Sequence, residues 1–150
     1  MTKTFMTPDI VAFDLAVTSK KQLLENLSER VAQHAGLCKR AVMDAIMKRE
    51  KLGSTGIGDG IALPHATLPQ GLVTVTLLAT LQSPVDFDSP DGVPVDLVAL
   101  VLGRQDESSS YLSSIKTASQ LLKERATSLR RASDESALLQ ILDTRLTAAA

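Results

Sequence analysis

The residues from Val93 to Leu102 are the part of this sequence that most constrains the fold. Nearly all of them are apolar. A continuous apolar run of this length is expected of a strand that lies in the middle of a sheet and is buried on both faces. Such a strand is stable only where helices cover both sides of its sheet.

Two helices are predicted before this run. Ser19 to Gln22 have the form of a capping box, and the leucines that follow recur at helical spacing as far as a stop at Gly36. A second helix is predicted over residues 39–50, where an apolar stripe ends at Arg49. A charge at that position either ends the helix favourably or faces a site.

The rest of the chain supplies strands and two more helices. Residues 72–81 alternate as a strand does, and Pro84 marks a loop before the central run. After Gly103 the spacing is helical again, and a last helix is predicted from Ser133 to Leu146. The order helix, helix, strands, helix, helix predicts an α/β fold with a mixed β-sheet sandwiched between α-helices.

Length and composition limit the other possibilities. We expect one domain over residues 1–150, with residues 1–8 loosely ordered. The net charge of -1 gives no reason to expect nucleic-acid binding, and no apolar run approaches the roughly 20 residues that membrane insertion requires. Cys38 is the only cysteine, which excludes an internal disulfide and a zinc–thiolate cluster and favours a cytoplasmic protein.

The segment that could carry chemistry is the glycine-rich stretch 53–60 together with His65. Glycine-rich turns can present several backbone N–H groups to an anion, and Ser54 and Thr55 add hydroxyl donors. Arg49 could offer a planar fork to phosphate oxygens. A neutral imidazole beside such donors is a reasonable acceptor for a phosphoryl group.

Other interpretations of this segment are weaker or stay open. The loop lacks the Gly-Lys-Ser/Thr of a P-loop, and it leads into a short strand rather than the helix of a dinucleotide-binding fold. No second histidine or cysteine lies at metal-ligand spacing, so no metal and no cofactor are predicted. From spacing alone, His65 is equally well interpreted as a structural histidine.

The stretch from Arg49 to Ala66, REKLGSTGIGDGIALPHA, closely resembles the signature of the fructose/mannitol-type enzyme IIA domains (type 2) of the bacterial phosphotransferase system. Within that family it is most similar to the standalone nitrogen-regulatory IIA proteins. The sequences PVDF at 84–87 and PVDLV at 94–98 agree with the resemblance. It implies a mixed sheet between helices, a phosphoryl group accepted by His65 from an HPr-like phosphocarrier protein, and assistance from Arg49.

One departure from the family pattern concerns Tyr111. The family usually carries a second active-site histidine where this chain has Tyr111, which can donate a hydrogen bond to phosphate but cannot supply an imidazolium charge. We therefore expect Ser54, Thr55 and Tyr111 to contact the phosphoryl group. Three roles stay open: a regulatory protein that docks on target proteins, a sugar-transport component that passes phosphate to a IIB domain, and a binding module that is not phosphorylated.

Overall fold

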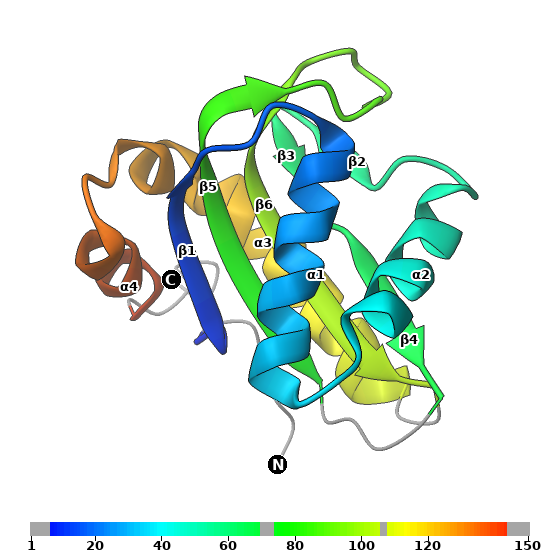
Figure 1. Cartoon of the computed structure of the whole chain (residues 1–150). Helices are drawn as coiled ribbons and strands as arrows, with labels where there is room; N and C mark the ends of the chain where they lie inside the picture. The colour runs from blue at the N-terminus through cyan, green and yellow to red at the C-terminus, as the bar shows by residue number, and fades with distance from the viewer. Residues whose placement is uncertain (1–6, 70–73, 106–107, 144–150) are drawn as a thin grey trace.

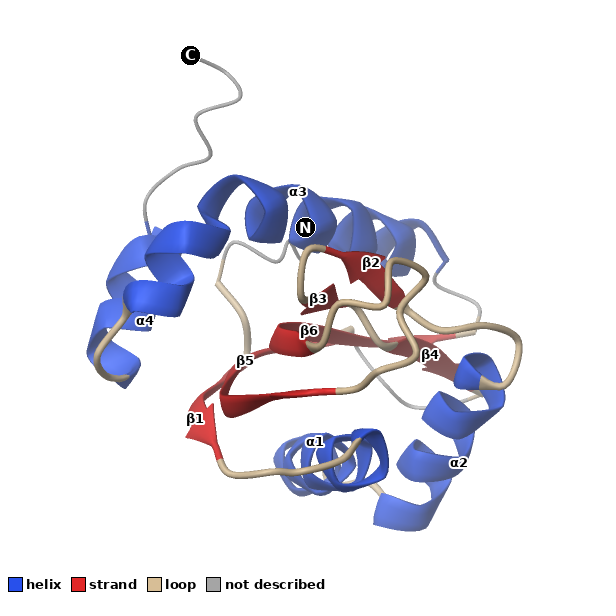
Figure 2. Ribbon diagram, turned by 90° about the horizontal axis from the view of Figure 1, so that it is seen from above, coloured by secondary structure: helices blue, strands red, loops and turns tan. Residues whose placement is uncertain are grey.

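Helices cover both faces of a single mixed sheet, as Figures 1 and 2 show from two directions. The computed structural model describes residues 7–69, 74–105 and 108–143. The arrangement of helices on both faces of the sheet confirms the predicted α/β sandwich. None of the helices in this described part of the chain is both long enough and apolar enough to cross a membrane.

The sheet has β6 at its centre. Its strands are β1 (Ile10–Leu15), β2 (Gly56–Gly58), β3 (Ile61–Ala62), β4 (His65–Leu68), β5 (Val75–Val85) and β6 (Val95–Arg104). They are arranged in the order β1-β5-β6-β3-β2, with β4 also pairing to β6. Strand β6 is antiparallel to β5 and parallel to β3 and β4, and the residues from Leu97 to Leu102 are fully buried. The apolar run is thus the central strand that its composition predicts.

The two helical layers enclose two separate apolar cores. The helices are α1 (Lys20–Ala35), α2 (Lys39–Glu50), α3 (Ser108–Arg131) and α4 (Glu135–Asp143). Helices α1 and α2 pack on one face of the sheet, and α3 and α4 pack on the other (Figure 2). Because successive residues of a strand point to opposite faces, Leu100 enters the first core and Val101 the second.

The predicted ends of α1 are confirmed. Ser19 caps the helix by accepting a hydrogen bond from the Gln22 backbone N–H, and Gly36 ends it in the left-handed conformation with φ 68°. The Gln22 side chain accepts from the backbone N–H of Thr18 rather than from that of Ser19. The capping box is therefore shifted by one residue on its return side.

The sequence did not predict the strands β1 and β4. Strand β1 is short and irregular, with Asp14 at φ 58°, and β4 follows directly after Pro64. Strand β5 was predicted to end before Pro84, but it continues through that residue to Val85. The predicted loose order of residues 1–8 concerns a segment of which only residues 7 and 8 are described. Leu146, the predicted end of the last helix, lies outside the described residues.

Candidate functional site

His65 is the first residue of β4 and lies at the wall of an open hollow. The backbone N–H of Val101 donates to the Pro64 carbonyl at 3.1 Å, which fixes the peptide before His65 against the central strand. The ring is half-buried. The hollow beside it measures about 590 Å³ and will be called the His65 hollow; Arg49, Ser54, Leu63, Ile115, Lys116 and Lys123 are among the residues that line it.

One nitrogen of the His65 ring has a fixed role. Nδ1 lies 2.8 Å from the carbonyl oxygen of Leu63, and since a carbonyl can only accept, Nδ1 carries the proton. Nε2 of a neutral ring then holds a free lone pair. Burial lowers the pKa of His65 from its ordinary 6.5, the Leu63 carbonyl opposes that shift, and the Arg49 cation adds to it. The net decrease keeps the ring neutral near pH 7.

Arg49 approaches His65 from the last turn of α2. Its Nη1 donates to the Gly53 carbonyl at 2.9 Å, which ties the guanidinium to the start of the glycine-rich loop. Arg49 lines the His65 hollow and also a neighbouring hollow of about 500 Å³, which Lys48, Leu52 and Tyr111 help to line. A guanidinium has five N–H donors, so the contact with Gly53 leaves others for an anion.

The buried Glu50 side chain holds the glycine-rich loop in place, a role that the sequence did not predict. Glu50 is buried, with Oε1 accepting from the backbone N–H of Thr55 at 3.2 Å and Oε2 accepting from the Thr55 hydroxyl. The Lys20 ammonium lies 2.9 Å from Oε1. The signal was present in the spacing, because Glu50 continues the buried stripe of Val42 and Ile46 at four-residue intervals.

These contacts connect Glu50 to His65 through the backbone. The carboxylate holds Thr55, whose carbonyl accepts from the Leu63 N–H at 2.9 Å. The Leu63 carbonyl in turn accepts from His65 Nδ1. The buried acid therefore positions the loop that sets the tautomer of the imidazole.

Ser54 and Thr55 both lie in the wall of the His65 hollow, but their hydroxyl groups already have partners. Ser54 Oγ donates to the Phe87 carbonyl at 2.9 Å and accepts from the Gly56 N–H. The Thr55 hydroxyl donates to Glu50. Their contact with phosphate stays a prediction, and it requires these bonds to be exchanged.

The glycine-rich loop also uses its backbone N–H groups internally. The N–H groups of Gly53, Thr55 and Gly56 bond within the loop or to Glu50, and that of Asp59 bonds to Asp91. The loop therefore supports the site, but these N–H groups already have partners. Side chains must accordingly provide most of the donors to a bound anion.

Tyr111 comes to the site from the first turns of α3. Its ring centroid is 6.2 Å from that of His65, and its side chain packs over Gly103 of β6. Burial raises the pKa of Tyr111 to about 12, so its hydroxyl stays protonated and can donate. That hydroxyl bonds to no other group among the described residues.

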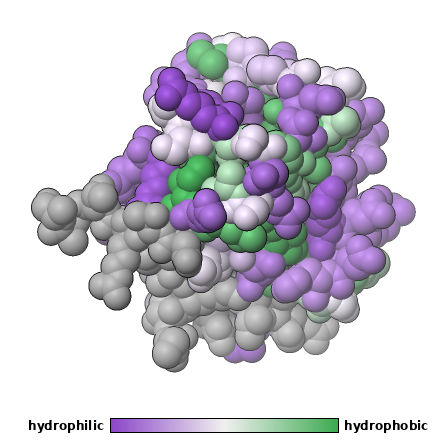
Figure 3. Space-filling model, turned by 90° about the vertical axis from the view of Figure 1, so that its left-hand side faces the viewer, coloured by the Kyte–Doolittle hydropathy of each residue, from purple (hydrophilic) through white to green (hydrophobic). Residues whose placement is uncertain are grey.

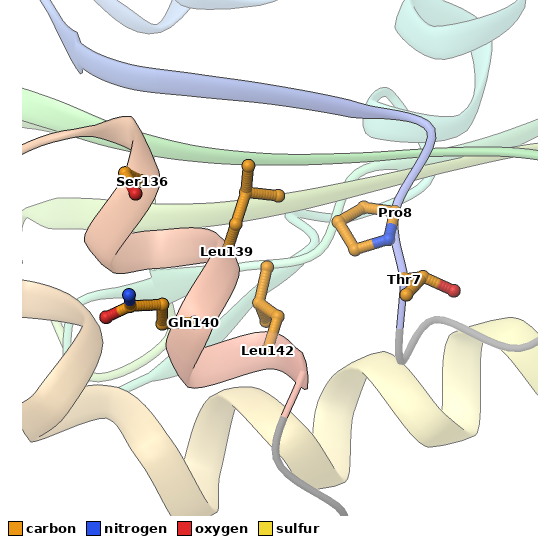
Figure 4. Close-up of a pocket in the computed structure, with 6 residues that line it drawn as sticks. All are labelled: Thr7, Pro8, Ser136, Leu139, Gln140 and Leu142. Carbon is orange, nitrogen blue, oxygen red and sulfur yellow. The ribbon is translucent and has the colours of Figure 1, made fainter.

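Other places in the described structure lack comparable chemistry. No group of three or more His, Cys, Asp or Glu side chains within it could hold a metal ion. A separate hollow of about 300 Å³ lies between the start of β1 and α4, where Leu139 and Leu142 point toward Pro8 (Figure 4). On that side of the molecule apolar residues come to the surface among hydrophilic ones (Figure 3), and no charged side chain is among the described residues that line the hollow.

Comparison with known proteins identifies the family of this chain. Residues 4–144 match the family model described as phosphoenolpyruvate-dependent sugar phosphotransferase system, EIIA 2. A nitrogen regulatory protein of Bradyrhizobium diazoefficiens is 37% identical over 139 residues, which is 91% of each chain.

Two solved structures share the fold. The crystal structure of the nitrogen regulatory protein IIA-Ntr from Neisseria meningitidis superposes with a TM-score of 0.79 at 31% identity, covering 88% of this chain and 92% of that one. The mannitol enzyme IIA of Escherichia coli, solved in complex with phosphorylated IIB, gives a TM-score of 0.72 at 20% identity, over 90% and 94% of the two chains. From the family match and these relatives we conclude that the chain belongs to the EIIA 2 family of the phosphoenolpyruvate-dependent sugar phosphotransferase system.

Proposed function

We propose that this protein is a phosphohistidine carrier that accepts a phosphoryl group on Nε2 of His65 from an HPr-like carrier. The observation that carries the proposal is the 2.8 Å contact between His65 Nδ1 and the Leu63 carbonyl, which leaves Nε2 unprotonated. Membership of the EIIA 2 family supports a role in phosphoryl transfer.

The transfer balances without movement of a proton. The Nε2 lone pair attacks phosphorus in line while the P–N bond of the donor phosphohistidine breaks, and the electron pair of that bond stays on the donor nitrogen. The donor ring, protonated on its other nitrogen, leaves as a neutral imidazole. His65 becomes the cationic ring, and its Nδ1–H stays bonded to the Leu63 carbonyl, which stabilises the new charge.

Side chains around the imidazole would hold the phosphoryl oxygens. Arg49 is the charged donor and Tyr111 the neutral one, because both line the neighbouring hollow and Tyr111 lies against the His65 ring. Ser54 and Thr55 would join them only by exchanging their present bonds. A preorganised charged donor such as Arg49 typically contributes about 10²-fold to a rate.

We further propose a regulatory role, in which the phosphoryl group on His65 changes which protein docks on the surface around it. The similarity to proteins named nitrogen regulatory proteins supports this choice. Transfer to a IIB domain is the alternative, since a protein of the same fold was solved in complex with phosphorylated IIB.

The proposal is tested by incubating the protein with enzyme I, an HPr-like carrier and phosphoenolpyruvate. Intact-mass analysis should show one phosphoryl group, lost in mild acid as a phosphohistidine is. His65→Ala should not be labelled, and His34→Ala, which changes the only other histidine, should be labelled like the parent protein. Undiminished labelling of His65→Ala would rule out His65, and absence of label on the parent protein would leave a binding module.

Addition of a IIB domain to the labelled protein separates the two roles. Rapid loss of the label to IIB would favour transport. A stable label, together with a target protein that binds only one of the two phosphorylation states, would favour regulation.

A further inference from the structure

We propose that Lys20 is a positioning residue for phosphoryl transfer to His65, acting through the buried Glu50 carboxylate that holds the glycine-rich loop. This inference rests on the proposed function and adds a residue that does not touch the reacting groups. Lys20 is the first residue of α1, and it is absent from the described residues that line the two hollows beside His65. Any effect of Lys20 on the transfer must therefore pass through other side chains.

The Lys20 ammonium is enclosed by groups from two other parts of the chain. Its Nζ lies 2.9 Å from Oε1 of Glu50, 3.7 Å from Oδ2 of the exposed Asp88, and 4.5 Å from the centroid of the buried Phe87 ring. The start of α1 and the segment that follows β5 lie at the same end of the sheet (Figure 1). The Lys20 side chain is 20% exposed, so these contacts replace much of its water.

The place of Lys20 in α1 does not explain why the residue is a cation. The N-terminus of a helix carries a partial positive charge, so a lysine in the first turn is unfavourable for the helix itself. The first turn of α1 contains no acidic residue that would compensate the lysine. The partner that accounts for the charge is Glu50, whose side chain is 3% exposed.

Glu50 in turn depends on Lys20. A carboxylate that is so deeply buried is unfavourable unless a cation and hydrogen-bond donors surround it. Among the described residues, Lys20 is the one cation within ion-pair distance of Glu50, since the neighbouring Arg49 donates to the Gly53 carbonyl instead. Without the ammonium, the carboxylate would gain stability by turning toward water, and Thr55 would be released.

Two contacts of Lys20 lead to neighbouring residues of the glycine-rich loop. Glu50 accepts hydrogen bonds from the backbone N–H and the hydroxyl of Thr55. The backbone carbonyl of Phe87 accepts a hydrogen bond from the Ser54 hydroxyl at 2.9 Å. One ammonium therefore contacts both of the residues that anchor positions 54 and 55 of the loop.

Two hydrogen bonds connect Thr55 to the imidazole. The Thr55 carbonyl accepts from the Leu63 N–H at 2.9 Å, and the Leu63 carbonyl accepts from Nδ1 of His65 at 2.8 Å. Displacement of Thr55 would therefore move the acceptor that fixes the tautomer of the ring and the direction of Nε2. A misplacement of about 1 Å can slow an enzymatic reaction by about 100-fold.

The kinetic test is rapid-quench measurement of phosphoryl transfer from a purified phosphorylated HPr-like carrier. We expect Lys20→Met to lower the rate at saturating carrier about tenfold. The carrier concentration that gives half of the maximal rate should stay unchanged, because Lys20 lies outside the hollows beside His65. The control is Lys21→Met, which removes an equal charge from an exposed position in the same helical turn and should transfer at the parent rate.

Two further variants separate the charge of Lys20 from its packing. Lys20→Arg keeps a cation that can pair with the carboxylate and stack on Phe87, and it should recover the parent rate to within about threefold. In a protein that already carries Glu50→Gln, Lys20→Met should change the rate by less than about twofold, because no buried charge then needs compensation. This comparison carries the test even where Lys20→Met alone does not fold.

Histidine ¹H–¹⁵N NMR provides a readout that altered stability alone would not move. The parent protein and Lys21→Met should show His65 as the Nδ1–H tautomer, bonded to the Leu63 carbonyl. In Lys20→Met, a fraction of the folded protein should carry the proton on Nε2, which removes the lone pair that attacks phosphorus. Circular dichroism gives the folded fraction, so that each rate is expressed per folded molecule.

Three results would overturn this role of Lys20 while the proposed function stands. The first is a parent-like rate per folded molecule for Lys20→Met, or an unchanged His65 tautomer in that variant. The second is a higher half-saturating carrier concentration at an unchanged maximal rate, which would place Lys20 in contact with the carrier. The third is an equal loss of rate on Lys20→Met whether or not Glu50→Gln is present. Failure of the parent protein to be labelled at His65 would instead refute the proposed function.

Discussion

At the residue scale, the chemistry depends on keeping one imidazole neutral beside a permanent cation. Burial and the Arg49 charge both disfavour protonation of His65, and the contact with the Leu63 carbonyl partly opposes them. The ring is therefore ready to attack at neutral pH, and the proton that it retains on Nδ1 is held away from the reacting nitrogen.

This balance gives opposite predictions for two neighbouring residues. Removal of the Arg49 cation should raise the pKa of His65, and removal of the Glu50 charge should lower it further. NMR titration of Arg49→Gln, Glu50→Gln and the parent protein would measure the shifts. The parent should titrate below 6.5, and its phosphorylation rate should fall only when the pH drops through that lowered value. A decrease of the pKa in Arg49→Gln would contradict the electrostatic account.

Tyr111 offers a second test at this scale. Tyr111→Phe keeps the ring that packs over Gly103 and removes only the hydroxyl donor. We expect a two- to tenfold lower rate of transfer at saturating donor, about the contribution of one neutral hydrogen bond. Thermal unfolding provides the control, because stability should be nearly unchanged; an unaltered transfer rate would show that the hydroxyl does not touch the phosphoryl group.

At the element scale, the end of α2 and the glycine-rich loop form one unit. Glu50 at the helix end holds Thr55, and Lys20 from the start of α1 pairs with the same carboxylate while lying 4.5 Å from the centroid of the Phe87 ring. Two helices and a loop therefore meet on one buried carboxylate. Removal of Glu50 leaves Lys20 with the exposed Asp88 carboxylate, 3.7 Å away.

We accordingly expect Glu50→Ala to lower the free energy of unfolding by about 3 kcal/mol, because the buried Thr55 loses its partner and Lys20 keeps only the Asp88 carboxylate, 3.7 Å away. Asp44→Ala, which removes an exposed acid from the same helix, should change it by no more than about 0.5 kcal/mol. Chemical denaturation of the three proteins measures both effects. A loss for Glu50→Ala as small as that for Asp44→Ala would refute the role of the buried acid.

Strand β6 and helix α3 pack closely at Gly103, where no space is left for a side chain. A Cβ added at Gly103 would lie 2.5 Å from Cδ1 of Tyr111, so alanine there must displace the tyrosine. We expect Gly103→Ala to destabilise the protein by about 1–3 kcal/mol and to slow transfer. In the double variant Gly103→Ala/Tyr111→Ala the clash is gone. The loss of stability in the double variant should therefore be smaller than the sum of the losses in the two single variants. Full additivity would contradict the contact.

At the scale of the whole molecule, the sequence predicted the layers because they depend on continuous patterns. The aliphatic run of β6 and the leucine spacing of α1 are long, and hydrophobic burial alone determines their positions. The expected interruption at Pro84 was wrong, since β5 continues to Val85.

Short elements and side-chain directions could not be predicted in the same way. Strand β4 has four residues, too few for a periodicity, and it forms only because β6 offers it a partner. The sequence indicates candidate residues for the site but not their partners: those of Ser54 and Thr55 are Phe87 and Glu50, and Phe87 lies 33 residues along the chain from Ser54. Local sequence carries no record of such a contact.

The most direct test of the account identifies the nitrogen that carries the phosphoryl group. Protein labelled with ¹⁵N at its histidines and phosphorylated by an HPr-like carrier can be examined by ¹H–¹⁵N and ³¹P NMR. Because Nδ1 of His65 donates to the Leu63 carbonyl, the phosphoryl group should be found on Nε2, with the Nδ1 proton retained. Phosphorylation of Nδ1, or a label on any residue other than His65, would contradict the geometry on which the proposed transfer depends.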